Sequence, residues 1–333
     1  MHIGVRLISI NASHRRQRIW NSDADQAFLQ SMHKLRRVVA IRVTPELAHL
    51  LGVPVCHFLL LQLPLYALTN SGDYWHDTFK SHLLNEIRMR RSIFNQVLYF
   101  RLDERGKYLG AIATYVDDSR STGSPLFERI TDATQHRFAC KPKECDKVDF
   151  AGIRVTRKTD GDLLHHLLHC ERVTKIHLNA FFRDFKSLVM HLSWQLHYQQ
   201  RIACAVTLLA QVTDIVFQKE PTKYIRLVKK IVVSIKARPD EGIFITKLST
   251  DGLRLRLYAD ASFVNNHCTY KSQLGYIIAL VDGHGNACII ANKYFKSRRV
   301  LRFVLAAKHP NSPRLSTSHS YCVTNFRKYL LSN

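Results

Sequence analysis

The sequence has no apolar run long enough to cross a membrane. Its most apolar stretch, residues 54–68, is shorter than the ~20 residues that a transmembrane helix needs, and His57, Gln62 and Pro64 interrupt it. No secretory signal peptide is evident. Residues 1–22 are basic and lack acidic residues, as in a mitochondrial transit peptide, but we interpret them as an ordinary amphipathic element. We therefore expect an intracellular protein, cytoplasmic or nuclear before mitochondrial, with no membrane partner.

The sequence also lacks any Cys-x-x-Cys pair, although it contains eight cysteines. Their irregular spacing argues against a zinc ribbon and against a disulfide scaffold. His165, His166 and His169 lie close enough to share a helical turn, but the glutamate that accompanies a helical zinc pair is absent. We interpret these histidines as a polar helix face rather than a metal site.

Acidic residues are scarce. Asp and Glu number 26 against 49 Lys and Arg, which gives a formal net charge of +23, and no acidic residue follows Asp282. Such an excess favours a polyanionic partner, because each Lys or Arg bound to a phosphate releases counterions. The hydrophobic fraction of 46% is ordinary for a folded protein, and 333 residues suffice for two or three domains.

The apolar spacing predicts a mixed α+β protein. Helices are expected over residues 74–89, 124–138, 162–217, 225–235 and 298–308, with a short turn or helix at 45–51, and residues 1–19 are expected to be helical or mixed. Strands are expected at 38–43, 58–61 (buried), 96–101, 109–116, 148–155, 253–259, 274–281 and 287–294. Residues 238–242 form a turn that is suited to a domain boundary.

Two adjacent carboxylates, Asp117 and Asp118, follow Tyr115-Val116 at the end of an apolar strand. Crowded carboxylates repel one another unless a positive group neutralises them, and Mg²⁺ prefers oxygen ligands. Two-metal nucleotidyl transfer needs a further carboxylate from a distant strand, for which Asp23 is the candidate. The alternative is a solvated turn, since Ser119-Arg120-Ser121 is turn-like as well.

Several blocks of the sequence occur in the order and spacing of a known family. They are residues 23–31 (Asp23-Ala24-Asp25-Gln26-Ala27-Phe28-Leu29-Gln30-Ser31), residues 65–75 with Trp75, Tyr115 to Asp118, residues 138–143, residues 150–153, residues 185–194 and 209–213, and residues 258–262, 272–276 and 296–300. Together they resemble a fragment of a copia-type retrotransposon Pol polyprotein. The resemblance implies a reverse-transcriptase palm, an antiparallel sheet with helices on one face, at 1–157. A helical thumb or connection at 158–238 and a truncated RNase H-like α/β unit at 239–333 would follow.

The family's activity is RNA-directed DNA polymerisation, and the resemblance implies a role for each matching position. Asp23, Asp117 and Asp118 would be catalytic and bind Mg²⁺. Tyr115 and Val116 would lie under the primer end, and Asn70 would face the nucleotide. Lys141 or Lys143 could face the triphosphate, with a solvated loop as the alternative. The implied partners are an RNA template with a DNA primer or an RNA/DNA hybrid, together with a second copy of the chain or other Pol segments.

The sequence departs from the family in ways that predict lost activity. Most of the fingers that precede the first catalytic aspartate are missing, and Ala67 and Asn70 replace the family's Gly and Gln. Asp260 matches the first RNase H carboxylate, but Lys308 stands where a glutamate is expected, so we predict no RNase H activity. We expect a degenerate reverse transcriptase-like protein with little or no polymerase activity and residual nucleic-acid binding. The alternative is a non-catalytic basic RNA- or DNA-binding protein.

Overall fold

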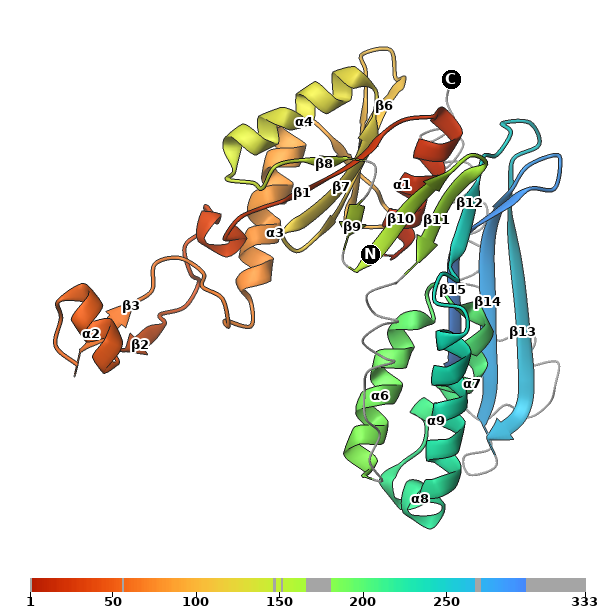
Figure 1. The fold of residues 1–333 in the computed structure, drawn as a ribbon. Coiled ribbons are helices and arrows are strands. Elements are labelled where there is room, and N and C mark those ends of the chain that lie inside the picture. Colours follow the sequence, from red (N-terminus) through yellow and green to blue (C-terminus); the bar gives the residue numbers. More distant parts are fainter. Residues whose placement is uncertain are drawn as a thin grey trace.

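The computed structural model describes residues 2–55, 57–145, 148–150, 152–165, 181–266 and 271–297. Over these residues the chain is a mixed α+β protein in which neighbouring strands pair antiparallel, as the sequence predicts (Figure 1). No helix in this part of the chain is long and apolar enough to span a membrane.

The largest sheet has six strands in the order β4-β5-β6-β7-β1-β8. Its strands are β1 (Ile19–Asp23), β4 (Arg90–Arg91), β5 (Leu98–Leu102), β6 (Tyr108–Tyr115), β7 (Asp118–Gly123) and β8 (Glu144–Cys145). The hairpin of β6 and β7 lies next to β1, so a strand from the start of the chain lies beside one from the middle. The expected strands at 96–101 and 109–116 are confirmed as β5 and β6.

Helices cover both faces of this sheet. Successive side chains of a strand point to opposite faces. Ile112 packs with α3 (Ser71–Ser81) and α4 (Pro125–Arg137), whereas its neighbours Ala111 and Ala113 pack with α1 (His2–Arg15). The expectation of helices on one face only is therefore wrong. A π-helical turn, His82–Glu86, extends α3, so the helix predicted at 74–89 is confirmed, with an earlier start.

The helix α1 is the centre of the molecule rather than an amphipathic surface element. Residues 4–12 are buried on every side, including the polar Ser9 and Asn11, because α1 lies between the six-stranded sheet and the strands of two further sheets. The Arg6 guanidinium donates to the carbonyls of Ile290 (3.3 Å) and His197. The expected amphipathic character is thus wrong, because the polar groups of α1 face protein instead of water.

A second sheet has the order β12-β11-β10-β9 and joins distant segments. Its strands are β9 (Val148–Phe150), β10 (Ile153–Lys158), β11 (Gly161–His165) and β12 (Ile243–Thr246). The single strand expected at 148–155 is wrong, because Gly152 (φ 78°) turns the chain into a hairpin. The helix expected from 162 is also wrong at its start, because β11 pairs with β12. That pair crosses the predicted boundary near 238, and the three-domain division stays a prediction.

The next helices enclose a core of their own beside a third sheet. These elements are α6 (Phe182–Gln195), α7 (Ala203–Ala210), α8 (Asp214–Lys219), α9 (Pro221–Lys236), β13 (Arg254–Asn266), β14 (Lys271–Val281) and β15 (Ala287–Lys296). Phe185 and Phe217 meet with ring centroids 4.9 Å apart, and α7 packs on β15 (Figure 1). The expected helices are confirmed from residue 182 onwards, and the three expected C-terminal strands are confirmed. The helix predicted at 298–308, with Lys308, lies outside the described residues.

A small hairpin projects from the rest of the molecule. The strands β2 (Ala40–Arg42) and β3 (Phe58–Leu60) flank α2 (Pro45–Leu51), apart from the sheets (Figure 1). The strand expected at 58–61 is confirmed, but its burial is not. Phe58 is 65% exposed and Leu60 is 62% exposed, because no element among the described residues covers these two side chains. The apolar composition of this strand could not predict that its side chains are exposed.

Candidate carboxylate site at the end of the central strands

The fold brings the three predicted aspartates to one end of the central strands. Asp23 is the last residue of β1 and lies directly opposite Asp118, the first residue of β7. Tyr115 pairs with Asp118 across the β6–β7 hairpin, so Asp117 lies in the intervening turn. Directly opposite residues of antiparallel strands hold their Cβ atoms about 4.5–5.5 Å apart. The site therefore gathers carboxylates from two segments that are far apart in the sequence.

The turn of the hairpin is held from two sides. Val116 has φ 54°, a left-handed conformation that is strained for a β-branched residue. The buried Trp75 of α3 donates its indole N–H to the Val116 carbonyl (2.7 Å), and the Ala24 amide donates to the Asp117 carbonyl (3.1 Å). These two bonds compensate the strain and fix the turn against α3 and β1. Trp75 therefore acts as a core residue and also positions the site.

A lysine provides the positive charge at this site. The Lys141 ammonium forms an ion pair with the Asp23 carboxylate, and the Lys141 amide donates to the Asp23 carbonyl (2.9 Å). The hydrogen bond of the Lys141 ammonium with the Asp23 carboxylate and the charge of that carboxylate raise the pKa of Lys141, and the charges of Asp25 and Asp117 act in the same direction. The crowded carboxylates are therefore partly neutralised by the chain itself.

A glutamine holds the Lys141 segment in place, and sequence reasoning gave it no role. The Gln30 side chain donates to the Ala139 carbonyl (2.9 Å) and accepts from the Ala139 amide (2.8 Å). The Asp25 amide also donates to the Ala139 carbonyl (2.9 Å). Gln30 ends the short helix Ala27–Gln30, which directly follows β1. Its place inside the motif at 23–31 was the available signal, but the partner at residue 139 is not visible in the sequence.

A buried arginine lies behind the carboxylates. Arg120 of β7 is fully buried, donates through Nε to Asn21 Oδ1 (3.1 Å) and lies 5.0 Å from the centre of the Phe150 ring. Burial lowers its pKa to about 10, against the opposing effect of Tyr198, Asp118 and further acidic groups. The expectation that Ser119-Arg120-Ser121 is turn-like is wrong, because all three residues are buried in the β7 strand. The solvated-turn alternative for Asp117 and Asp118 themselves stays a prediction.

The remaining predicted residues have different surroundings. Tyr115 is 37% exposed and Val116 is 48% exposed, so both are accessible beside the carboxylates. Asn70 directly precedes α3. Lys143 is largely buried and forms ion pairs with Glu128 and Asp132 of α4 (2.9 Å each). The solvated-loop alternative is therefore wrong for Lys143.

Two further predicted residues lie on other sheets. Asp260 is exposed on β13, opposite Gly275, in the three-stranded sheet. His165 is buried on β11, where its Nε2 lies 3.2 Å from the Thr156 hydroxyl oxygen. The expected helix face is wrong for His165, since it belongs to a strand, and His166 and His169 lie outside the described residues.

The three aspartates are not arranged as a set of metal ligands. Among the residues that the structure describes, no three His, Cys, Asp or Glu side chains are grouped closely enough to hold one. Asp23, the first of the expected ligands, is instead engaged by the Lys141 ammonium. In this arrangement the three aspartates do not fit Mg²⁺, because a cation of the chain already binds one of the oxygens that the metal would need.

Comparisons with known proteins give no family assignment. No protein-family model matches the sequence, and no curated protein matches it. A crystal structure of prototype foamy virus protease-reverse transcriptase is similar with a TM-score of 0.25 and 12% sequence identity. The alignment covers 90% of this chain and 55% of that one, so the chain spans about half the length of the viral protein. A likeness this weak carries no argument about fold or activity.

Proposed function

We propose that this protein is a reverse transcriptase-like nucleic-acid-binding protein with a degenerate polymerase site, of copia-type retrotransposon ancestry. The observation that carries the proposal is the meeting of Asp23 with Asp118 across β1 and β7, with Asp117 in the adjoining turn. The order of sequence blocks around these aspartates is the separate support for the ancestry.

The proposed ligand is a nucleic acid, in the form of an RNA template, a DNA primer or their hybrid. The net charge of +23 supports an affinity for phosphates that does not depend on catalysis. The ion pair of Lys141 with Asp23 supports a site that is stable without a metal ion. In this proposal the aspartates belong to an inherited scaffold, and the basic surfaces do the binding.

A second candidate function is RNA-directed DNA polymerisation. The meeting of carboxylates from distant strands favours it, because a solvated Asp-Asp turn would need no partner on β1. Exposed Tyr115 and Val116 beside the carboxylates also suit a primer end. The two candidates differ in whether the protein needs the Asp117 carboxylate. A polymerase needs it for primer extension, whereas a nucleic-acid-binding protein does not need it for binding.

The test measures binding and extension with the same purified chain. Binding of a fluorescent RNA/DNA hybrid and of single-stranded RNA is expected to weaken with salt and to be unchanged in Asp117→Asn, because phosphate contacts dominate the affinity. Loss of binding in Asp117→Asn would contradict the proposal. Primer extension on an RNA template is expected to be negligible with Mg²⁺ or Mn²⁺. Robust extension that Asp117→Asn abolishes would establish the polymerase instead.

A further inference from the structure

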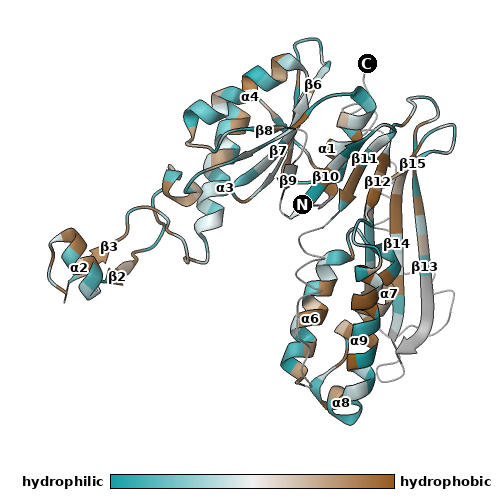
Figure 2. Cartoon of the chain, in the orientation of Figure 1, coloured by the Kyte–Doolittle hydropathy of each residue, from teal (hydrophilic) through white to brown (hydrophobic). Residues whose placement is uncertain are grey.

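The helix α9 presents a basic surface that is unrelated to the carboxylate site. Its apolar side chains Val228, Ile231 and Ile235 are buried in the core of the helical region. Hydrophilic and apolar residues alternate along α9 (Figure 2), and its lysines and its arginine are exposed. In Figure 1 this helix lies at the far end of the molecule from the six-stranded sheet.

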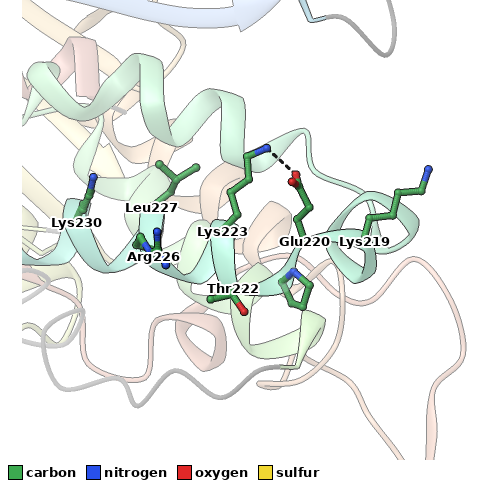
Figure 3. Close-up of a pocket in the computed structure, with 8 residues that line it drawn as sticks. Lys219, Glu220, Thr222, Lys223, Arg226, Leu227 and Lys230 are labelled. Atoms are coloured by element: carbon green, nitrogen blue, oxygen red, sulfur yellow. Dashed lines mark hydrogen bonds and ion pairs between the residues drawn. The ribbon is translucent and has the colours of Figure 1, made fainter.

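Four cations gather at an open hollow of about 570 Å³ beside the start of α9. Lys223, Arg226 and Lys230 follow one another at helical spacing, and Lys219 comes from the last turn of α8 (Figure 3). Residues three and four apart lie on the same side of a helix, where like charges are destabilising. The repulsion between these cations is therefore unfavourable for the isolated helix, and an anion bound beside them would reduce it.

The counter-charge inside the hollow is small. Glu220 forms an ion pair with Lys223 (2.6 Å; dashed in Figure 3). Within the described part of the chain, no carboxylate forms an ion pair with Lys219, Arg226 or Lys230. The hollow thus keeps a net positive charge, and the Thr222 hydroxyl adds a neutral hydrogen-bond donor beside it. Clustered cations and a hydroxyl match the oxygens of phosphate groups.

We propose that the basic surface of α9, formed by Lys219, Lys223, Arg226 and Lys230, binds the phosphodiester backbone of a nucleic acid. The proposal rests on the proposed function and assigns its phosphate contacts to a surface remote from the aspartates. From Lys223 to Lys230 the helix rises about 10 Å. One strand of a duplex places a phosphate at about every 3.4 Å of the duplex axis, so this stretch covers the axial rise of about three phosphates.

An anionic membrane fits this surface less well. A helix that lies in a membrane interface buries an apolar face among the lipids, but the apolar face of α9 is already in the protein core. Leu227 is the exposed apolar side chain in the hollow, and it is only 41% exposed. Val233 of α9 is also exposed (64%), but it lies six residues from Leu227 and therefore on a different side of the helix. Charge without a continuous apolar face favours a nucleic acid.

The experiment compares two triple variants with the same net charge. One carries Lys223→Gln, Arg226→Gln and Lys230→Gln on α9. The control carries Arg105→Gln, Lys107→Gln and Lys158→Gln, which neutralise exposed cations on other elements. Both sets lie on the surface, so thermal unfolding should be unchanged. The affinity for a short RNA/DNA hybrid is measured from about 50 to about 200 mM salt, the range where phosphate contacts change the affinity most.

Each contact between a cation of the protein and a phosphate releases counterions and contributes about 0.9 to the slope of log affinity against log salt concentration. The α9 variant is expected to reduce that slope by about 2.7, which corresponds to three contacts, and the control by less than about 1. Equal slopes for the two variants, with wild-type binding intact, would overturn the α9 assignment and leave the proposed function standing. Absence of wild-type binding would overturn both. Binding to phosphatidylserine vesicles that only the α9 variant loses, with hybrid binding unchanged, would replace the nucleic acid with a membrane.

Discussion

The hairpin that carries Asp117 and Asp118 depends at its other end on two glycines. Gly110 of β6 and Gly123 of β7 lie directly opposite each other, and the fully buried Phe127 ring of α4 fills the space above them. A Cβ atom at Gly110 would lie 2.1 Å from the Phe127 ring, and the ring supplies all three of its nearest atoms. A Cβ atom at Gly123 would also lie 2.7 Å from the Leu109 carbonyl oxygen, which belongs to the backbone. The two glycines therefore differ in what opposes a side chain.

This difference predicts the outcome of a double-mutant cycle. Gly110→Ala should destabilise the protein by about 1–3 kcal/mol through overpacking, and Phe127→Ala by about 3–5 kcal/mol through the lost ring. In the double variant the added methyl group enters space that the ring has left, so the combined cost should fall about 1–3 kcal/mol below the sum. Gly123→Ala should combine with Phe127→Ala more nearly additively, because the backbone clash remains.

Urea unfolding followed by circular dichroism measures all five variants against the wild type, with equal m-values required before the free energies of unfolding are compared. Additive costs for Gly110→Ala and Phe127→Ala would refute the reasoning, since they would show that the ring does not fill the space above Gly110. An equally large coupling at Gly123 would show that the backbone can move aside.

Two further changes test the electrostatics. Burial lowers the pKa of His197 to about 4, and the charge of Arg6 acts in the same direction. Because the folded state favours neutral His197, its stabilisation is present above pH 6.5 and is lost as the pH falls towards 4, and His197→Gln should flatten this part of a plot of melting temperature against pH. Removal of the Lys141 charge should free the Asp23 carboxylate, so Lys141→Met should bind Mn²⁺ several-fold more tightly than the wild type in a titration monitored by electron paramagnetic resonance. Unchanged affinity, or a gain that persists when Asp23→Asn is added, would contradict this reading of the ion pair.

The sequence correctly predicted those elements whose boundaries are set by neighbouring capping and turn residues. Ser124 and Pro125 predicted the start of α4, and the Ser124 hydroxyl accepts from the Phe127 amide (3.2 Å) as an N-cap should. The C-terminal strands could also be predicted from the sequence, because turn residues such as Asp282-Gly283 separate long apolar runs. In both cases the information lies within a few residues of the element.

Elements decided by distant partners were misassigned. The apolar run Leu163-Leu164 fits a helix or a strand, and its pairing with β10 on one side and with the distant β12 on the other selects the strand. The sequence around Arg120 predicted a turn. Arg120 is instead buried by contacts with Asn21 and with Phe150 of another sheet, and neither contact is visible in the local sequence. The motif order correctly placed Asp23 near Asp118, but it could not show that Lys141 would pair with Asp23.

The cations at the carboxylate end and the cations of the α9 surface differ in whether they are already paired. At the carboxylate end, cations have partners within the chain: Lys141 pairs with Asp23, and Lys143 pairs with Glu128 and Asp132. A cation that is already paired gains less from a phosphate, because it must first give up its carboxylate. On the α9 surface only Lys223 would have to give up a carboxylate, that of Glu220, among the ion pairs formed by the described residues. If the excess positive charge of the chain serves a nucleic acid, its strongest contacts should therefore lie on α9, and substitutions at the aspartates should leave binding almost unchanged.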